Sequence, residues 1–249
     1  MTVTTEKPKK RASKKTNGSV SETRIIEINK PSFNVSRVVV RQKEGEPGLI
    51  THRLDSEKLR AYTPDGQPKK NKKDAIRDPE QEILSCFHVI NPELPDYAAG
   101  KYGYPSVGFK KSSVIAMGRF LKSIPQTEAW GLYHVMGQLV RIDFEAINSR
   151  EDVTRDSGMT RAPRLTYRPE FMEWSAELYV RYMNELISIE QIADILDLAG
   201  STVGVGDWRV DKKGSHGQFE VDHVDPVVEQ HEVELFKATD GNVMDAGIE

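Results

Sequence analysis

WSAELYVRYMNELISIEQIADILDLAG, residues 174–200, places the clearest strand of the chain just before its clearest helix. In the first nine residues apolar and polar side chains alternate strictly, which is the period of a β-strand with one buried face. In the last thirteen, apolar side chains recur every three or four positions, as on an amphipathic helix. Ser188 and Gln191 predict a capping box at the start of that helix, and Gly200 predicts its end.

The remaining elements of the core follow from the same two periods and from turn residues. Residues 82–90 (EILSCFHVI) and 131–144 have strand character, and residues 106–124 carry an apolar helical stripe after Pro105. Residues 217–221 predict a last short strand. The order strand, helix, strand, strand, helix, strand is that of an α+β ferredoxin-like fold, in which two helices cover one face of an antiparallel sheet.

Other segments are predicted to lie outside this core. Residues 33–54 contain two β-rich runs around the turn EGEPG and predict an added N-terminal β-hairpin. Polar and helix-breaking residues predict a long exposed loop inserted at about residues 147–170. We therefore expect a disordered basic arm at residues 1–24, a single domain at residues 25–225 and an acidic tail at residues 226–249.

Charge is segregated at the two ends of the chain. The 249 residues carry a formal charge of −3, but residues 1–24 hold seven Lys or Arg against two Glu, and residues 218–249 hold nine Asp or Glu against one Lys. Basic arms commonly contact nucleic acid, and acidic tails commonly recruit basic proteins. The same pattern also fits two solvated ends that only aid solubility, so both interpretations stay open.

The composition excludes several classes of protein. No apolar run approaches the roughly 20 residues of a membrane-spanning helix, and no signal peptide is recognised, so we expect a cytoplasmic protein without a membrane partner. Cys86 is the only cysteine, which excludes an internal disulfide and a cysteine-based zinc site.

Glycines follow the predicted helix in STVGVGDWRVDKKGSHG, residues 201–217. In Rossmann and P-loop sites the glycines lie between a strand and a following helix, whereas here the order is helix, glycines, strand. We therefore expect no nucleotide cofactor. The loop is either a tight connection after a helix cap or a surface that lies against a phosphate chain while a tryptophan stacks on bases. The second interpretation involves Gly204, Gly206, Trp208, Arg209, Lys212 and Lys213.

Two lysines lie near the start of the helix predicted at residue 106. Helix N-termini favour acidic residues because the macrodipole is positive there, yet this segment carries Lys110 and Lys111, followed by Ser112. We interpret the cations and free amides as a phosphate site; a solvated lysine pair is the alternative.

The inserted loop is rich in arginine with neighbouring aromatic residues. Arginine forks bind phosphates and aromatic rings stack on bases, so this composition suits a single strand. Nearby acidic residues, such as Asp152 and Glu170, fit a solvated salt-bridge loop equally well. The candidate contacts are Arg155, Arg161, Arg164, Tyr167 and Arg168.

Catalytic constellations are sparse. His134 lies in a predicted strand, where a histidine is more often structural than a general base, and His216 lies near the glycines, where it would serve a nuclease as an acid or base. The acids and His223 at residues 220–225 open the acidic tail, so we predict no metal site there. We expect a non-enzymatic protein, with a histidine-dependent or metal-dependent nuclease as the alternative.

The predicted element order, the segment YPSVGFKKSS at residues 104–113 and the glycine-containing loop together resemble the RAMP superfamily, the RRM-like backbone and processing subunits of CRISPR effector complexes. In that family a Pro-Gly-Ser-Ser-x-Lys-Gly-type segment opens the first helix, and a glycine-rich loop contacts RNA. Lys111 stands where the family has glycine, and the loop has fewer glycines than usual. The resemblance covers residues 33–221, and the matching positions are Pro105, Ser106, Lys110 and Arg119 for the first motif, and Gly204, Gly206, Trp208, Gly214 and Gly217 for the second.

Residues 199–221 are also similar to a pattern in uncharacterised tailed-phage proteins, which implies a phage-encoded protein in the host cytoplasm. We therefore predict a non-enzymatic protein that binds single-stranded RNA or DNA and assembles along the strand as a homo-oligomer. A phage structural or assembly protein is a further alternative.

Overall fold

The computed structural model describes residues 31–53, 78–122, 124–155, 163–226, 228, 233 and 235–237. The chain divides into two units, Met1–Pro31 and Ser32–Glu249, and every element below belongs to the second. That unit is of mixed α+β type with antiparallel sheets. The predicted basic arm lies outside the described residues, as does most of the acidic tail. In the described part, no helix has the length and apolar character to span a membrane.

The larger sheet has seven antiparallel strands. They are β1 (Asn34–Gln42), β3 (His88–Val89), β4 (Tyr102–Pro105), β5 (Tyr133–Val135), β6 (Leu139–Asp143), β9 (Ser175–Tyr182) and β10 (Phe219–Asp225). Their order is β10-β1-β9-β6-β4-β3, and β5 pairs with β9. Burial alternates along β9, which confirms the strand predicted from the alternation of its side chains. The strand predicted over residues 131–144 is divided into β5 and β6.

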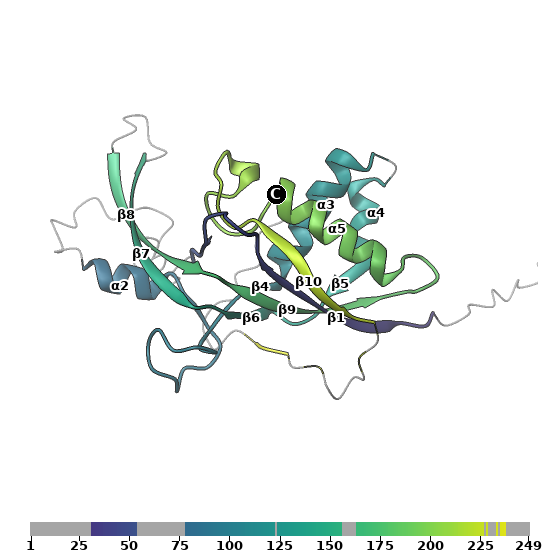
Figure 1. Ribbon diagram of the computed structural model, residues 1–249, viewed down its shortest axis with the longest axis horizontal. Helices are drawn as coiled ribbons and strands as arrows, with labels where there is room; N and C mark the ends of the chain where they lie inside the picture. The colour runs from purple at the N-terminus through teal and green to yellow at the C-terminus, as the bar shows by residue number, and fades with distance from the viewer. Residues whose placement is uncertain are drawn as a thin grey trace, which may run out of the picture. The chain divides into compact units, whose positions relative to one another are not determined.

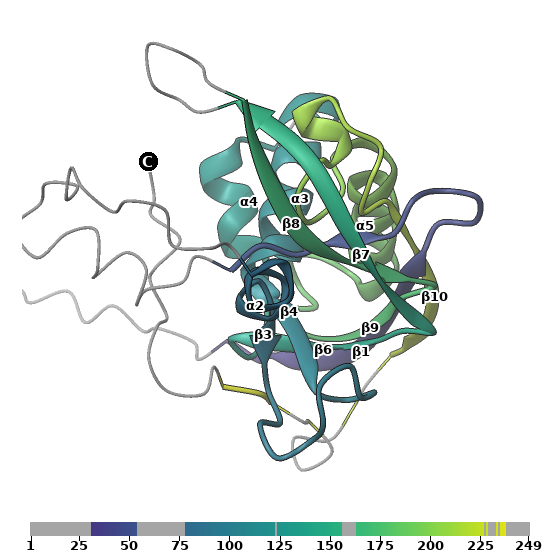
Figure 2. The same ribbon diagram turned by 90° about the vertical axis from the view of Figure 1, so that its left-hand side faces the viewer.

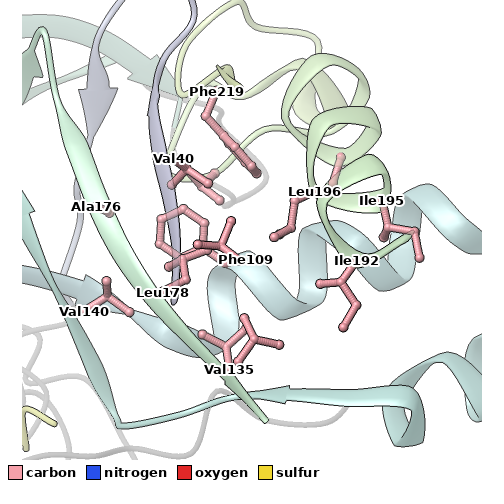
Figure 3. Packing of buried hydrophobic residues seen from close by; sticks show 14 of the residues in the cluster. Val40, Phe109, Val135, Val140, Ala176, Leu178, Ile192, Ile195, Leu196 and Phe219 are labelled. Carbon is pink, nitrogen blue, oxygen red and sulfur yellow. The ribbon is translucent and has the colours of Figure 1, made fainter. Parts of the chain in front are cut away.

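Helices α3 (Ser106–Phe120), α4 (Gln126–Leu132) and α5 (Ile189–Thr202) lie on one face of this sheet (Figure 1). The capping box of α5 is confirmed, since the Gln191 amide donates to Ser188 Oγ at 3.3 Å and the Ser188 amide donates to Gln191 Oε1 at 3.1 Å. The core lies between sheet and helices, where Val40, Ala176 and Leu178 from the strands meet Phe109 and Leu196 (Figure 3).

Gly200 does not end α5, contrary to the prediction. A Cβ atom at this position would lie 1.9 Å from the carbonyl oxygen of Phe219 in β10. The glycine therefore lets the helix approach the edge strand closely, and the helix continues to Thr202.

The predicted inserted loop is a β-hairpin, which corrects the loop assignment for residues 147–170. Strands β7 (Ala146–Arg155) and β8 (Pro163–Met172) pair over ten positions and form a second sheet with β2 (Leu49–Ile50) in the order β2-β8-β7. The hairpin extends away from the larger sheet, and α2 (Pro79–Ser85) lies beside β8 (Figures 1 and 2).

Two further predictions are wrong. The two β-rich runs of residues 33–54 do not form a hairpin, because β1 is central in the larger sheet, between β9 and β10, while β2 pairs with β8. Residues 82–90 are not one strand, because Asp78 caps α2 by accepting from the amides of Glu80 and Gln81, with Pro79 at the first helical position. Only His88 and Val89 of that segment belong to a strand.

Candidate nucleic-acid interface

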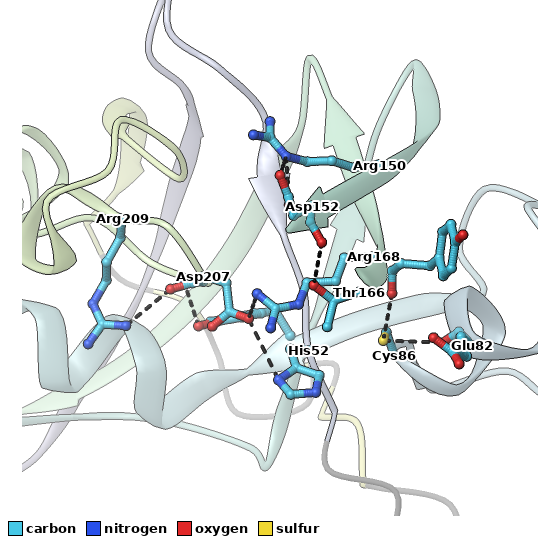
Figure 4. Close-up of polar contacts among 12 residues, drawn as sticks. His52, Glu82, Cys86, Arg150, Asp152, Thr166, Arg168, Asp207 and Arg209 are labelled. Atoms are coloured by element: carbon cyan, nitrogen blue, oxygen red, sulfur yellow. Dashed lines mark hydrogen bonds and ion pairs between the residues drawn. The ribbon is translucent and has the colours of Figure 1, made fainter. Parts of the chain in front are cut away.

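The β7–β8 hairpin has one polar face. Residues directly opposite each other in an antiparallel pair share a face, and Arg150 lies opposite Arg168, with Asp152 opposite Thr166. Arg150 Nε donates to both oxygens of Asp152 at 2.8 and 2.9 Å (Figure 4). Its Nη1 lies 3.8 Å from Glu170 Oε2. Asp152 and Glu170 thus balance the positive charge of Arg150, which lies opposite Arg168.

The glycine loop, residues 203–217, is fixed to the second sheet by its backbone. The Asp207 amide donates to the Ile50 carbonyl at 3.0 Å, and the Gly217 amide donates to the Gly48 carbonyl at 3.0 Å. Gly206 has φ +77°, and a Cβ there would lie 2.5 Å from Ile50 O. Its amide donates to the buried Tyr104 hydroxyl at 2.8 Å. The loop is therefore a fixed surface, and only glycine fits this close approach.

The structure brings the glycine loop and the polar face of the hairpin together, although they are distant in sequence. Arg168 Nη1 lies 2.8 Å from Asp207 Oδ2, and Arg150 Nη1 lies 2.8 Å from His216 Nε2. The Arg150 guanidinium carbon also lies 5.9 Å from the centroid of the Trp208 ring. Two of the predicted nucleic-acid features are therefore parts of one surface.

Trp208 is the exposed aromatic side chain of this surface. It is 41% exposed, and its backbone has φ +54°, a left-handed conformation that is costly for a tryptophan. Its carbonyl oxygen accepts from the His216 amide at 3.1 Å, so the loop itself holds this conformation. An exposed ring with a guanidinium nearby can stack on a base.

Most cations of this surface are paired, and two are not. Arg119 Nη2 lies 2.6 Å from Asp211 Oδ1, and Arg209 Nη2 lies 3.5 Å from Asp211 Oδ2 while its Nη1 donates to Gly206 O at 3.1 Å. Lys212 and Lys213 are exposed, and neither has an ion-pair partner in the described part of the chain. These two lysines are the free positive charges of the glycine loop.

The lysines predicted at the start of α3 occupy a different position. The helix begins at Ser106, so both lie in its second turn, away from the free amides. Lys110 is 4% exposed, donates to Ala129 O at 2.7 Å and lies 3.5 Å from the Tyr133 ring centroid. Burial lowers its pKa from 10.5 to about 7. Lys110 is thus an interior group, and a phosphate contact there does not fit its placement.

Ser112 is likewise buried and donates to Ala199 O of α5 at 3.4 Å, so it joins two helices instead of facing a ligand. Lys111 is exposed on α3.

The remaining predicted contacts belong to the hairpin. Tyr167 is partly buried on β8, opposite Glu151. Arg155 and Arg164 lie in the paired strands, opposite Pro163 and Thr154. Arg161 lies outside the described residues.

The two candidate catalytic histidines lie in different environments. His216 is 7% exposed, and its Nε2 lies near both Arg150 and Glu170 Oε1, the latter at 3.3 Å. Burial, followed by the charge of Arg150, lowers its pKa. His134 is exposed on β5 opposite Arg181, and burial together with that arginine lowers its pKa too. Among the described residues, no three His, Cys, Asp or Glu side chains are grouped to hold a metal ion.

Sequence reasoning missed a group of basic side chains beside this surface. His52 Nδ1 lies 3.6 Å from Asp207 Oδ2, Arg53 follows it in the chain, and His88 begins β3. The histidines are 36 positions apart in the sequence and belong to no motif; a hydrogen bond from the Arg53 amide to Cys86 O at 3.1 Å joins the two segments.

Comparisons with known proteins give a distant structural neighbour. No family model matches the sequence, and no curated protein matches it. Among solved structures, a similar chain occurs in the cryo-EM structure of the Type III-B Cmr-beta bound to cognate target RNA. The two chains are 11% identical with a TM-score of 0.39, over 78% of this chain and 61% of the other, so this chain spans less than two thirds of that neighbour.

Proposed function

We propose that this chain binds single-stranded nucleic acid, RNA or DNA, at the surface formed by the glycine loop and the polar face of the β7–β8 hairpin. The observation that carries the proposal is Trp208, an exposed ring held in a left-handed backbone conformation and accompanied by Arg150. Such a conformation is costly and persists where the surrounding structure holds it, commonly at binding sites.

The chemistry of the surface suits weak, sequence-tolerant binding. Trp208 stacks on a base, an interaction that every base can make. Lys212 and Lys213 contact phosphates, whereas the arginines are largely neutralised by Asp152, Asp207 and Asp211. Since neither stacking nor phosphate contacts read base edges, we expect little base preference.

A matched pair of tryptophans gives a direct test. Trp208 is 41% exposed on the glycine loop, and Trp130 is 46% exposed on α4, so their rings are similarly accessible. Loss of one base stack corresponds to about 1–3 kcal/mol, or roughly 5- to 150-fold in affinity. We expect Trp208→Ala to weaken binding of fluorescent oligonucleotides by that factor, and Trp130→Ala to leave it unchanged.

Other results would contradict the proposed surface or favour another function. Equal affinity of the Trp208→Ala variant and the wild type would refute the proposed surface. Cleavage of labelled RNA or DNA in the presence of Mg²⁺ would favour a nuclease. Absence of binding at low salt, together with a large homo-oligomer, would favour a structural or assembly protein.

We also propose that β1, α3, β6, β9, α5 and β10 form a ferredoxin-like, RAMP-like core. Two features support this: the strand order β10-β1-β9-β6 with all neighbours antiparallel, and α3 and α5 on one face. In NMR spectra, Val38 of β1 should show contacts to Leu178 on β9 and to Val224 on β10.

We further propose side-by-side assembly on long nucleic-acid strands; sedimentation with a long oligonucleotide should then show several protomers per strand.

A further inference from the structure

Unpartnered polar groups gather where the chain leaves β2. Thr51 is 1% exposed, and its Oγ1 atom has no hydrogen-bond partner in the described structure. Arg53, two residues later, is partly exposed and makes no ion pair with any described residue. A buried hydroxyl without a partner is costly and commonly marks the site of an unseen water or ion. Among the described residues, none provides a hydrogen-bond partner for the Thr51 hydroxyl or an ion-pair partner for the Arg53 guanidinium.

His88 lies next to the same segment. The Arg53 amide donates to Cys86 O at 3.1 Å, which fixes Arg53 beside the residues that lead into β3. Burial, followed by the positive charges of Arg53 and His52, lowers the pKa of the His88 imidazole to about 4. Basic groups are thus held close together despite their repulsion.

The Asp207 carboxylate of the glycine loop already has two partners. Asp207 Oδ2 lies 2.8 Å from Arg168 Nη1 and 3.6 Å from His52 Nδ1, so its charge is shared by two cationic groups (Figure 4). In the described part of the chain, Asp207 makes no ion pair with Arg53.

We propose that Thr51, Arg53 and His88 form a binding site for a phosphate group. A hydroxyl, a guanidinium and an imidazole are all hydrogen-bond donors, and a guanidinium fork matches the geometry of phosphate oxygens. The segment adjoins the glycine loop, because the Asp207 amide donates to Ile50 O. The phosphate has two possible sources. One is the nucleic-acid strand that stacks on Trp208, and this source rests on the proposed function. The other is a free phosphoester.

Histidine titration with inorganic phosphate as the probe tests the site directly. A bound anion favours the charged imidazole, so we expect phosphate to raise the pKa of His88 by about one unit relative to chloride at equal ionic strength, as followed by NMR. Arg53→Gln should abolish the shift and Arg53→Lys should retain part of it. An unchanged His88 titration, or the same shift in Arg53→Gln, overturns the proposal.

Thr51→Val provides a second test that is insensitive to misfolding. The variant replaces the unpartnered hydroxyl by a methyl group of similar size, so the thermal midpoint should stay equal or rise. Phosphate affinity should fall about fivefold, as expected for one lost hydrogen bond. Unchanged affinity contradicts the proposed role of the hydroxyl.

Addition of an oligonucleotide, followed by the fluorescence of Trp208 and the NMR signal of His88, identifies the source of the phosphate. If the strand quenches Trp208 and shifts His88, the strand supplies the phosphate. If phosphate shifts His88 but no oligonucleotide quenches Trp208, the phosphate site stands for a free phosphoester and the proposed function fails. If the oligonucleotide quenches Trp208 while neither probe shifts His88, the proposed function stands and the phosphate site is refuted.

Discussion

Removal of the two free cations of the glycine loop should change the salt dependence of binding by a defined amount. Lys212 and Lys213 are exposed without an acidic partner among the described residues, whereas the arginines around them are paired. Each phosphate contact to a single strand adds about 0.7 to the slope of log affinity against log salt. The double variant Lys212→Gln, Lys213→Gln should therefore flatten this slope by about 1.4.

The same slope sets the loss of affinity at a given salt concentration. Relative to 1 M salt, a slope difference of about 1.4 corresponds to roughly 25-fold weaker binding at 0.1 M and to almost no difference at 1 M. Fluorescence anisotropy with a labelled oligonucleotide across this salt range measures both quantities.

A matched control removes the same charge from the opposite face of the larger sheet. Arg37 and Arg141 are paired with Asp225 and Asp143 at 2.6 and 3.0 Å, so the double variant Arg37→Gln, Arg141→Gln loses two cations that are already neutralised. Its slope should match the wild type. Equal slopes for all three proteins, or equal flattening in both variants, would refute the assignment of phosphate contacts to the loop lysines.

Three further predictions concern stability. Gly206→Ala should lower the free energy of unfolding by about 1–3 kcal/mol, because its Cβ would lie 2.5 Å from Ile50 O and the backbone has φ +77°. Gly131→Ala on α4, which has open space around it, should change the free energy of unfolding by less than about 1 kcal/mol. Urea denaturation measures both. The pKa of Lys110 is about 7 in the folded chain and near 10.5 when unfolded, so the unfolded state binds more protons between these values. The wild type should therefore gain about 2 kcal/mol from pH 7 to pH 9, and Lys110→Met should lose this gain; a flat wild-type profile would contradict it. Glu170→Leu should lower the free energy of unfolding by about 2–4 kcal/mol, because it removes the acceptor of the Gly48 amide at 3.1 Å and the carboxylate that lies 3.3 Å from His216; an unchanged free energy in urea denaturation would show that this buried carboxylate is dispensable.

Local signals in the sequence predicted several elements correctly. The alternation in β9 and the capping box of α5 are both satisfied within the element itself, so no knowledge of distant partners was needed. A helix was also predicted over residues 106–124 from its apolar stripe; α3 begins at Ser106 as predicted and ends earlier, at Phe120.

Helix α2 was missed although its signals, the Asp78 cap and Pro79, are local, whereas the other missed elements depend on distant partners. In β7 polar and charged side chains occupy most positions, and its strand structure becomes evident only through pairing with β8, where Arg150 lies opposite Arg168 and is compensated by Asp152 and Glu170. The same holds for the candidate surface. The glycine loop and several of its charged residues were predicted, but the burial of Lys110 and the pairing of the arginines with acids follow from tertiary packing.

The left-handed backbone of Trp208 sets stability against binding. Glycine or asparagine adopts φ +54° more readily than tryptophan, so Trp208→Gly or Trp208→Asn should relieve strain and raise the thermal midpoint. Selection for thermal stability alone should therefore replace Trp208, whereas selection for binding to a nucleic-acid strand should retain it. A library randomised at position 208 should yield glycine or asparagine when it is sorted for thermal stability, and tryptophan when it is sorted for binding to a nucleic-acid strand.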